Sequence, residues 1–369
     1  MAPSGDPTSS RSEQAKSLRD ALATSLQFSV FPDSTNIHFI PNGTVDTLVT
    51  PASVANELFP INPAERLTPS KREVDQALVN YVAASAKKLL IISILNNPSC
   101  GLRAAMEAFK THQFGDDDLP VIEAENQFPP CFYQWDLLSR RNFRSDQWKV
   151  LVPVFPKVFT RFHFGTEIIL PFTYVDPVRK EGTFGDVYQV TILKSHQEDP
   201  MRKHNGLLAN AAIKELKASA ASGEKGGKDD KAKKVFKAWE AEAQALEDTS
   251  RLKHKHIVTV KSIFTKGPRH YFMFQWADGG SLRDLYKGDL WPNVTARLVE
   301  EVTGQLGGLF SALSALHTYQ KDGSSAQPGL LAVPGQNQGS YRHGDLKPEN
   351  ILIFKDATKV GYSQRHPIL

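Results

Sequence analysis

The feature that most constrains the fold is a series of short strand-like runs in the second half of the chain. These runs are rich in β-branched and aromatic residues, are separated by turn residues, and lie at 168–174, 187–193, 208–214, 256–264 and 271–276. Such a series is typical of an antiparallel sheet. One helical pattern, at 235–246, interrupts the series, and a long amphipathic pattern follows it at 294–317. Because strands come first and helices later, the sequence predicts an α+β fold and not an alternating βαβ fold.

The first part of the chain carries helical signals. Thr50-Pro51 and Thr68-Pro69 are typical helix starts, because Thr caps free backbone N–H groups and Pro at the first position has none to satisfy. After the second pair, apolar residues recur at spacings of three and four, at Val74, Leu78, Tyr81, Val82, Leu89 and Ile92. This spacing predicts one amphipathic helix that ends at 96–98, and a further helix is expected at 102–109.

These patterns divide the chain into three parts. Residues 1–20 are polar, Ser-rich and aperiodic, so we expect a disordered tail. A mainly helical accessory region is expected at 21–165 and a second domain at 166–369. Two domains suit a length of 369 residues, and a composition of 40% hydrophobic and 23% charged residues excludes wholesale disorder.

Composition also narrows the expected partners. The longest apolar run, 89–95, is far shorter than the roughly 18 residues needed to cross a bilayer. The N-terminus lacks the apolar stretch of a secretory signal. Two cysteines, Cys100 and Cys131, form neither a disulfide framework nor a structural zinc site by themselves. We therefore expect an intracellular protein without a membrane partner, with cytoplasm and nucleus both open.

The net charge of +4 arises from one stretch. Residues 214–237 contain eight Lys and four Asp or Glu, a local balance equal to that of the whole chain. The centre of the stretch, 219–234, is rich in Gly, Ser, Ala and Lys and has no apolar periodicity. This composition indicates a solvated insertion and not a nucleic-acid surface, so no nucleic-acid partner is expected.

Two glycines, a lysine and a glutamate suggest a phosphate site. The segment KEGTFGDVYQV places Gly182 and Gly185 in a turn between two strands, where backbone N–H groups can approach phosphate oxygens. An ordinary hairpin turn would use the same glycines. Lys214 ends an apolar run, and Glu242 shares a helix face with Leu246, so the carboxylate can hold the ammonium. Taken singly, each charge also fits a solvated surface.

The strongest signal is the segment YRHGDLKPENIL at 341–352. It supplies an aspartate (Asp345), a lysine two residues later (Lys347) and an asparagine five residues later (Asn350). Phosphoryl transfer needs a group that accepts the proton of the attacking hydroxyl, a cation near the γ-phosphate and a ligand for magnesium. The three residues in one loop match these roles.

The motifs HGDLKPEN, AAIK and EGTFGDV, with a helical Glu, occur in an order that resembles the eukaryotic serine/threonine protein kinase family. The long helical leader is similar to that of fungal kinase-like proteins. The likeness runs over 168–359, roughly half of the chain. It implies a bilobal kinase-like fold with an antiparallel N-lobe sheet, a helix C and an incomplete helical C-lobe. It also implies ATP and Mg²⁺ as cofactors and a protein hydroxyl of unknown identity as the substrate.

The resemblance also implies roles for single residues. On the nucleotide side, Lys214 would contact the α- and β-phosphates while paired with Glu242. The residues that would enclose the nucleotide are the loop positions Gly182, Gly185 and Val187, Phe274 at the back of the adenine pocket, and the hinge Gln275, Trp276 and Ala277. On the catalytic side, Asp345 would be the base, Lys347 the γ-phosphate contact and Asn350 a magnesium ligand.

Four departures from the family pattern affect these expectations. Lys180 replaces the first glycine of the loop, and Gly344 replaces an arginine that holds phosphorylated activation loops in many kinases. A Gly-, Pro- and Gln-rich insert occupies 318–340, where mobility is expected. After Asn350 the sequence contains no Asp-Phe-Gly, the usual magnesium motif. We therefore expect a kinase domain truncated after the catalytic loop, with poor turnover.

Two alternatives remain open from the sequence. One is an inactive pseudokinase or scaffold that binds partners through its helical N-terminal region. The other is a small-molecule phosphotransferase, since His-Gly-Asp also begins the catalytic loop of antibiotic and choline kinases. The residues Lys347 and Pro348 that follow favour the protein kinase pattern.

Overall fold

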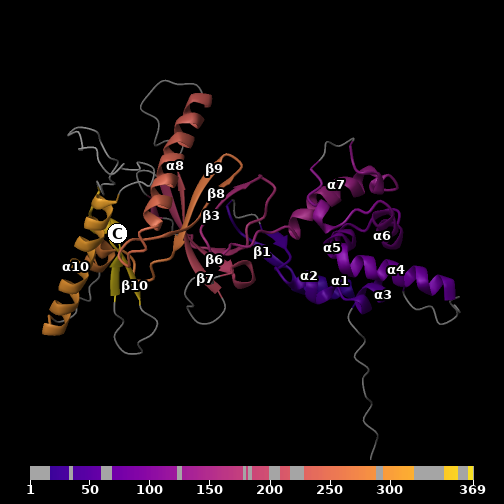
Figure 1. The fold of residues 1–369 in the computed structure, drawn as a ribbon, viewed down its shortest axis with the longest axis horizontal. Coiled ribbons are helices and arrows are strands. Elements are labelled where there is room, and N and C mark those ends of the chain that lie inside the picture. The colour runs from indigo at the N-terminus through magenta and orange to yellow at the C-terminus, as the bar shows by residue number, and fades with distance from the viewer. Residues whose placement is uncertain are drawn as a thin grey trace, which may run out of the picture. The chain divides into compact units, whose positions relative to one another are not determined.

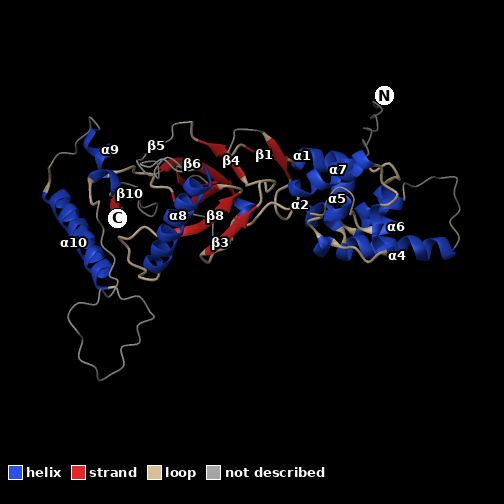
Figure 2. Ribbon diagram, turned by 90° about the horizontal axis from the view of Figure 1, so that it is seen from above, coloured by secondary structure: helices blue, strands red, loops and turns tan. Residues whose placement is uncertain are grey.

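The computed structural model describes residues 17–32, 36–59, 69–122, 127–177, 180–181, 185–198, 208–216, 228–287, 294–319, 345–355 and 365–368. The chain forms two compact units. The first, here called the helical unit, comprises Met1–Val154 and Glu167–Pro171, and the second, the sheet unit, comprises Phe155–Thr166 and Phe172–Leu369. The colour bar of Figure 1 follows the chain through both units. Figure 2 shows most helices in the first and most strands in the second.

The helical unit contains seven described α-helices and a short antiparallel hairpin. The hairpin pairs β1 (Gln27–Ser29) with β2 (Ile37–Phe39). The helices are α1 (Leu18–Ser25), α2 (Thr44–Leu48), α3 (Pro51–Leu58), α4 (Pro69–Ser85), α5 (Lys87–Asn96), α6 (Leu102–Thr111) and α7 (Leu137–Asp146). The helix start at Thr50-Pro51 is confirmed, because Thr50 accepts the Ser53 backbone N–H and Pro51 is the first residue of α3. Thr68 and residues 1–16 lie outside the described residues.

The expected single helix through Val74 and Ile92 is wrong. It breaks at Ala86, where α4 and α5 meet at 101°. The Asp116 carboxylate accepts the backbone N–H groups of Lys88 and Leu89 at 2.9 and 3.0 Å, and so satisfies the new helix start from a distant position. Val74 is 58% exposed instead of lying on a buried stripe.

The core of the helical unit is strongly aromatic. The Phe132 ring lies 5.2 Å from Phe109, 5.2 Å from Trp135 and 4.8 Å from Phe143 between ring centroids. All four side chains are buried, and several pairs meet edge to face, the arrangement that aromatic quadrupoles favour.

Among the described residues no single helix is long and apolar enough to cross a membrane. The segment of α4 from Arg72 and helix α5 reach the required length and apolarity only when they are taken together as a bent pair.

The sheet unit is built on a seven-stranded sheet. The strand order is β3-β8-β9-β7-β6-β4, with β5 also paired to β6. All described pairings in this sheet are antiparallel except that of β3 with β8. The strands are β3 (Thr160–Phe164), β4 (Phe172–Val175), β5 (Lys180–Glu181), β6 (Gly185–Leu193), β7 (Leu208–Leu216), β8 (Val260–Lys266) and β9 (Arg269–Gln275). A small separate ladder pairs β10 (Leu352–Lys355) with β11 (Arg365–Ile368).

Three boundaries predicted from the sequence differ from those observed in the sheet. The run expected at 168–174 starts late, because Glu167–Pro171 belongs to the helical unit. The run expected at 256–264 also starts late, since β8 begins at Val260 after a turn. Strand β3 lies within the range 21–165 that the sequence assigns to the helical region, yet it pairs in parallel with β8. The predicted class, a mainly antiparallel sheet with helices, is confirmed.

The described residues of the sheet unit also form three α-helices: α8 (Lys228–Ser250), α9 (Leu282–Lys287) and α10 (Ala296–Thr318). Helix α8 packs on the sheet, where Trp239 and Ala243 share a buried cluster with Phe272. It is longer than expected, because residues 228–234, predicted as part of a solvated insertion, are helical. Lys and Ala in that stretch have high helix propensity. Residues 217–227 and 320–344, which include most of both expected inserts, lie outside the described residues.

Helix α10 attaches to the loop between α8 and β8. Ala312 and Leu316 are buried against Ile257, and His256 Nε2 lies 3.1 Å from Gln305 Oε1. Gly308 makes this approach possible, because a Cβ there would lie 2.1 Å from the buried His256 ring. The attachment places α10 beside the turn that links α8 to the sheet.

Candidate functional site

The first group of predicted site residues meets between the sheet and α8. Strand β7 lies between β6 and β9, and its register sets Lys214 opposite Val187 on one side and Phe272 on the other. Lys214 Nζ lies 2.5 Å from Glu242 Oε1 on α8, and 5.8 Å from the centre of the Phe272 ring. The two side chains are 28% and 33% exposed, so the ion pair is partly accessible to solvent. The structure therefore brings together the lysine and glutamate that the sequence paired.

The glycine-rich segment is described in part. Gly182 lies outside the described residues, and Gly185 is the first residue of β6 instead of lying in the turn. A Cβ on Gly185 would lie 2.3 Å from the Glu215 backbone oxygen, so close pairing of β6 with β7 already requires this glycine. Val187 is half-buried. A role of these residues over a nucleotide stays a prediction.

The predicted adenine side lies at the end of β9. Phe274 is partly buried and packs on the cluster that contains Trp239 and Ala243 of α8. The chain then leaves the sheet through Gln275, and the Trp276 backbone N–H still reaches the Asn210 oxygen at 3.4 Å. Ala277 is buried. Residues 275–277 therefore form the start of the segment that leaves β9.

The second group of predicted residues forms a closed loop of polar contacts. Lys347 Nζ lies 2.8 Å from Asp345 Oδ2, and Asn350 Nδ2 donates to the Asp345 backbone oxygen at 2.7 Å and to Oδ2 at 3.1 Å. The Asp345 and Lys347 side chains are 60% and 47% exposed. Pro348–Asn350 forms a single 3₁₀ turn that brings the asparagine back to the aspartate. The structure thus gathers the three residues of the predicted catalytic loop around one carboxylate.

Backbone hydrogen bonds connect this loop to the segment after the predicted hinge. The Leu282 N–H donates to Ile351 O, and Gly279 N–H donates to Ile353 O, both at 2.8 Å. Gly279 permits this approach, since a Cβ there would lie 2.5 Å from the Ile353 side chain. These hydrogen bonds therefore link the segment after β9 to the segment that follows Asp345.

One ion pair at this junction was not expected from the sequence. Arg283 Nη1 on α9 lies 2.5 Å from Glu349 Oε1, next to Asn350. The two residues are 66 positions apart. No local pattern marks such a pair, because helix spacing rules reach only three or four residues.

The donor atoms of the loop fit a magnesium ion that also binds phosphate and water. Among the described residues there is no cluster of three or more His, Cys, Asp or Glu that could hold a metal ion. Magnesium at phosphate sites, however, uses one or two protein oxygens and takes the rest from phosphates and water. Asn350 donates through Nδ2 to Asp345, so its carbonyl Oδ1 points to the other side of the amide and remains suited to a cation.

Comparisons with known proteins add little to this picture. No family model matches the chain, and no curated protein matches it. Among solved structures, the kinase domain of PknI from Mycobacterium tuberculosis, solved as a double mutant, is similar with 22% identity and a TM-score of 0.29. The likeness covers 54% of this chain and 59% of that chain, so the protein spans about three fifths of that neighbour. A likeness at this level is too weak to support a function, which must rest on the residues of the site.

Proposed function

We propose that the sheet unit binds Mg-ATP and transfers its γ-phosphoryl group to a serine or threonine hydroxyl of a protein. The observation that carries the proposal is the 2.5 Å ion pair between Lys214 and Glu242. A lysine on an inner strand of the sheet, half-buried and held by a carboxylate from the covering helix, presents a cation in a fixed position. Such a cation is suited to the α- and β-phosphates of a nucleotide.

The residues around Lys214 would each contact or support a different part of the nucleotide. Glu242 keeps the Lys214 ammonium in place, so the side-chain entropy is lost before the ligand binds. Backbone groups of 275–277 would meet the polar edge of the adenine, and Phe274 would close the back of the pocket. These roles follow from the resemblance in the sequence and agree with the half-buried position of Phe274.

The loop at 345–350 would carry the transfer. The substrate hydroxyl oxygen attacks the γ-phosphorus, the bond to the bridging oxygen breaks, ADP leaves, and the hydroxyl proton passes to the Asp345 carboxylate. Lys347 would neutralise charge on the transferred group, and the amide of Asn350 orients Asp345 through Oδ2. A magnesium ion held by Asn350 together with the phosphates would supply positive charge to the phosphates.

The test is nucleotide affinity of the full chain, measured by isothermal titration with and without magnesium. Lys214→Met keeps the length of the side chain and removes the charge, so ATP affinity should fall about 10- to 100-fold, as for the loss of a contact to a charged group. The matched control is Lys237→Met, an exposed lysine on α8. Equal ATP affinity of wild type and Lys214→Met would contradict the proposal.

A separate readout addresses transfer. With radiolabelled ATP and a mixture of protein substrates, Asp345→Asn should abolish phosphorylation of serine and threonine and leave ATP affinity within about twofold. Loss of both binding and transfer in this variant would assign Asp345 to the nucleotide pocket and not to the chemistry.

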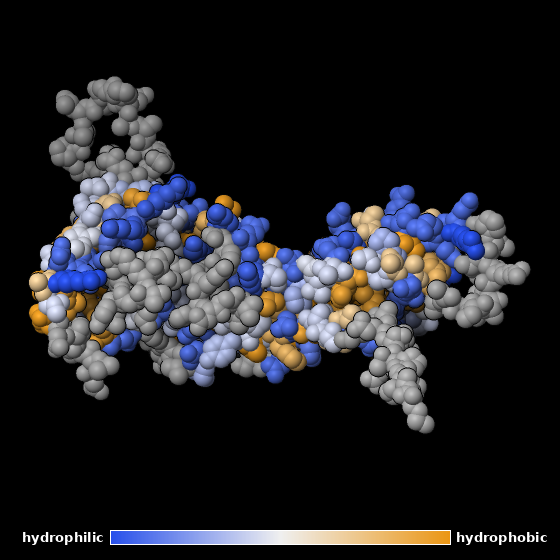
Figure 3. Space-filling model, turned by 90° about the horizontal axis from the view of Figure 1, so that it is seen from below, coloured by the Kyte–Doolittle hydropathy of each residue, from blue (hydrophilic) through white to orange (hydrophobic). Residues whose placement is uncertain are grey.

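One observation favours a second candidate, a partner-binding protein without catalysis. The helical unit exposes three large apolar side chains at the start of α7: Tyr133 (67%), Leu137 (51%) and Leu138 (67%). Figure 3 shows hydrophobic surface exposed on this unit and also at the α10 end of the sheet unit. Exposed apolar side chains that form one contiguous patch can mark an interaction surface, and this candidate assumes that these three do so. This candidate predicts that ATP causes no thermal stabilisation, with or without magnesium.

A further inference from the structure

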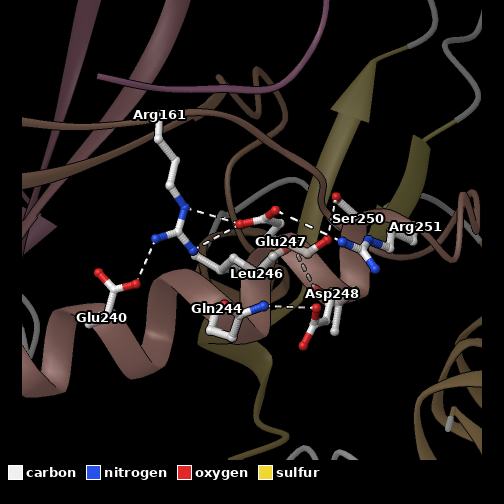
Figure 4. A network of polar contacts seen from close by, with 9 residues as sticks. Arg161, Glu240, Gln244, Leu246, Glu247, Asp248, Ser250 and Arg251 are labelled. Atoms are coloured by element: carbon white, nitrogen blue, oxygen red, sulfur yellow. Dashed lines mark hydrogen bonds and ion pairs between the residues drawn. The ribbon is translucent and has the colours of Figure 1, made fainter. Parts of the chain in front are cut away.

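Helix α8 is anchored to the sheet by ion pairs at two places. The first is the Lys214–Glu242 pair of the candidate site. The second is Arg161 on β3, whose Nη1 lies 2.7 Å from Glu240 Oε1 and whose Nη2 lies 2.8 Å from Glu247 Oε2. Arg161 Nε donates to the same Glu247 oxygen at 3.0 Å. Figure 4 shows the guanidinium group spanning these two carboxylates along the helix.

The two anchors lie on opposite sides of the buried face of α8. At about 100° per residue, Trp239, Ala243 and Leu246 form one stripe, and these are the α8 residues in the cluster on the sheet. Glu240 and Glu247 are seven residues apart and so share one side of that stripe. Glu242 falls on the other side. A rotation of α8 about its axis that releases one anchor therefore strains the other.

Arg161 is well placed to act as a fixed point. Its strand pairs in parallel with β8, with Arg161 opposite Ile263, and Ser262 Oγ donates to the Thr160 oxygen. The side chain is 26% exposed, and the Glu247 side chain 28%. Burial alone would lower the Arg161 pKa, but hydrogen bonds and charges from Glu240 and Glu247 outweigh it and raise the pKa. The planar guanidinium can bind two carboxylates at once, which a lysine ammonium does less well.

We propose that Arg161 is a positioning residue that sets the rotation of α8, so that Glu242 reaches Lys214. Its effect on nucleotide affinity rests on the proposed function, whereas its effect on the Lys214–Glu242 pair does not. Arg251, the residue after the end of α8, approaches the same Glu247 only at 4.0 Å and is 53% exposed, so it does not replace Arg161.

Strand β3, which carries Arg161, lies in the chain between two segments of the helical unit. The strand follows Val154, where the first part of the helical unit ends, and precedes Glu167–Pro171, which belongs to the helical unit again. The segment that carries Arg161 is thus bounded in sequence at both ends by the helical unit.

The first experiment measures the Lys214–Glu242 pair without any nucleotide. The full chain is labelled briefly with a limiting amine-acylating reagent, and the modified fraction of Lys214 is determined by peptide mass spectrometry. An amine held by a carboxylate must leave it to react, so wild type should label slowly and Glu242→Gln should set the fast limit. Arg161→Ala should raise Lys214 labelling at least threefold, and Arg161→Lys should fall between wild type and Arg161→Ala.

The matched control is Arg269→Ala. It removes another arginine–glutamate contact of the same sheet, that of Arg269 with Glu215 at 3.8 Å, and neither of these residues belongs to α8. This variant should label Lys214 at the wild-type rate. Unchanged Lys214 labelling in both Arg161 variants overturns the inference, as does an equal increase in Arg269→Ala.

The second experiment measures Mg-ATP affinity of the same variants by isothermal titration. Arg161→Ala should weaken binding about 5- to 20-fold, a usual range for coupling between sites, with partial rescue in Arg161→Lys and no change in Arg269→Ala. Failure of the wild type to bind ATP contradicts the proposed function but leaves the labelling result to decide the positioning role. If Arg161→Ala does not fold, Arg161→Lys decides both measurements.

Discussion

The two units of this protein keep their helices in place by different means. In the helical unit, α5 is buried on nearly all sides and the aromatic side chains Phe109, Phe132 and Phe143 fill the space between helices. In the sheet unit, α8 buries one narrow stripe and is flanked by ion pairs that remain about one quarter to one half exposed. The helical unit is thus organised for stability, and α8 is organised so that charged groups stay accessible.

The difference shows how the same element serves two purposes. An apolar contact is strong but insensitive to orientation, whereas charge-assisted hydrogen bonds depend on distance and angle and therefore fix the rotation of a helix. Partly exposed ion pairs contribute little stability on their own. Their value in α8 is to present Glu242 to Lys214. Hydrogen exchange of peptides from each unit in urea tests this division, because it reports the stability of the two units separately.

The largest effect is expected in the aromatic core. Phe132→Ala should lower the free energy of unfolding of the helical unit by about 3 to 5 kcal/mol, because it removes several ring contacts and leaves a cavity. Tyr133→Ala, next to it but 67% exposed, should change it by less than about 0.5 kcal/mol. Equal losses in the two variants would show that the core is not packed as described.

A smaller effect is expected where α10 meets the turn after α8. Gly308→Ala would place a methyl group 2.1 Å from the buried His256 ring and should destabilise the sheet unit by about 1 to 3 kcal/mol. Gly304→Ala, one turn earlier with nothing within 4 Å, should stabilise α10 by up to about 1 kcal/mol. The same sign in both variants would contradict the close contact.

Polar groups in the helical unit act at helix ends, and their effect should be smaller still. Thr50→Ala removes the side chain that caps α3. It should lower the free energy of unfolding of the helical unit by about 1 kcal/mol, measured by hydrogen exchange in urea. Thr24→Ala in α1, an exposed threonine whose hydroxyl donates to Ala21 O in its own helix, should stay within about 0.5 kcal/mol of wild type. A loss in Thr50→Ala as large as in Phe132→Ala would mean that polar contacts dominate this unit as well.

The smallest effect is a pH dependence at the start of α7. The Asp136 carboxylate accepts the Ser139 backbone N–H, then side-chain hydrogen bonds from Ser99 and Ser139, and these contacts lower its pKa. A lowered pKa in the folded state contributes stability above the unfolded value of about 3.9, and that contribution is lost as the pH falls from there through the lowered pKa. Asp136→Asn should therefore be slightly less stable than wild type at pH 7, and the difference should shrink as the solution is made more acid.

Thr50, an uncharged residue that caps α3, serves as the control for the pH dependence of Asp136. The difference between Thr50→Ala and wild type should not change between neutral and acid solution, measured by the same exchange experiment. A difference for Asp136→Asn that grows in acid would reverse the sign and contradict the hydrogen-bonded carboxylate.

Much of the local structure could be predicted from the sequence. The β-branched runs indicated the strands β6, β7 and β9 with boundaries close to those observed, and Thr50-Pro51 marked a helix start. The pairing of Lys214 with Glu242 and the grouping of Asp345 with Asn350 were also predicted and lie together. In these cases the signal is a spacing of a few residues or a short motif, and neighbouring residues carry most of the information.

The tertiary structure decided the rest, because it depends on residues far apart in the chain. At the break at Ala86 the carboxylate of Asp116 accepts hydrogen bonds from the start of α5, and among the described strands β3 pairs with β8, about a hundred residues later. Likewise, Arg161 becomes an anchor of α8 only when the sheet and the helix have packed together. The amino-acid order specified the chemical groups and the local elements, and long-range packing set which of those groups meet.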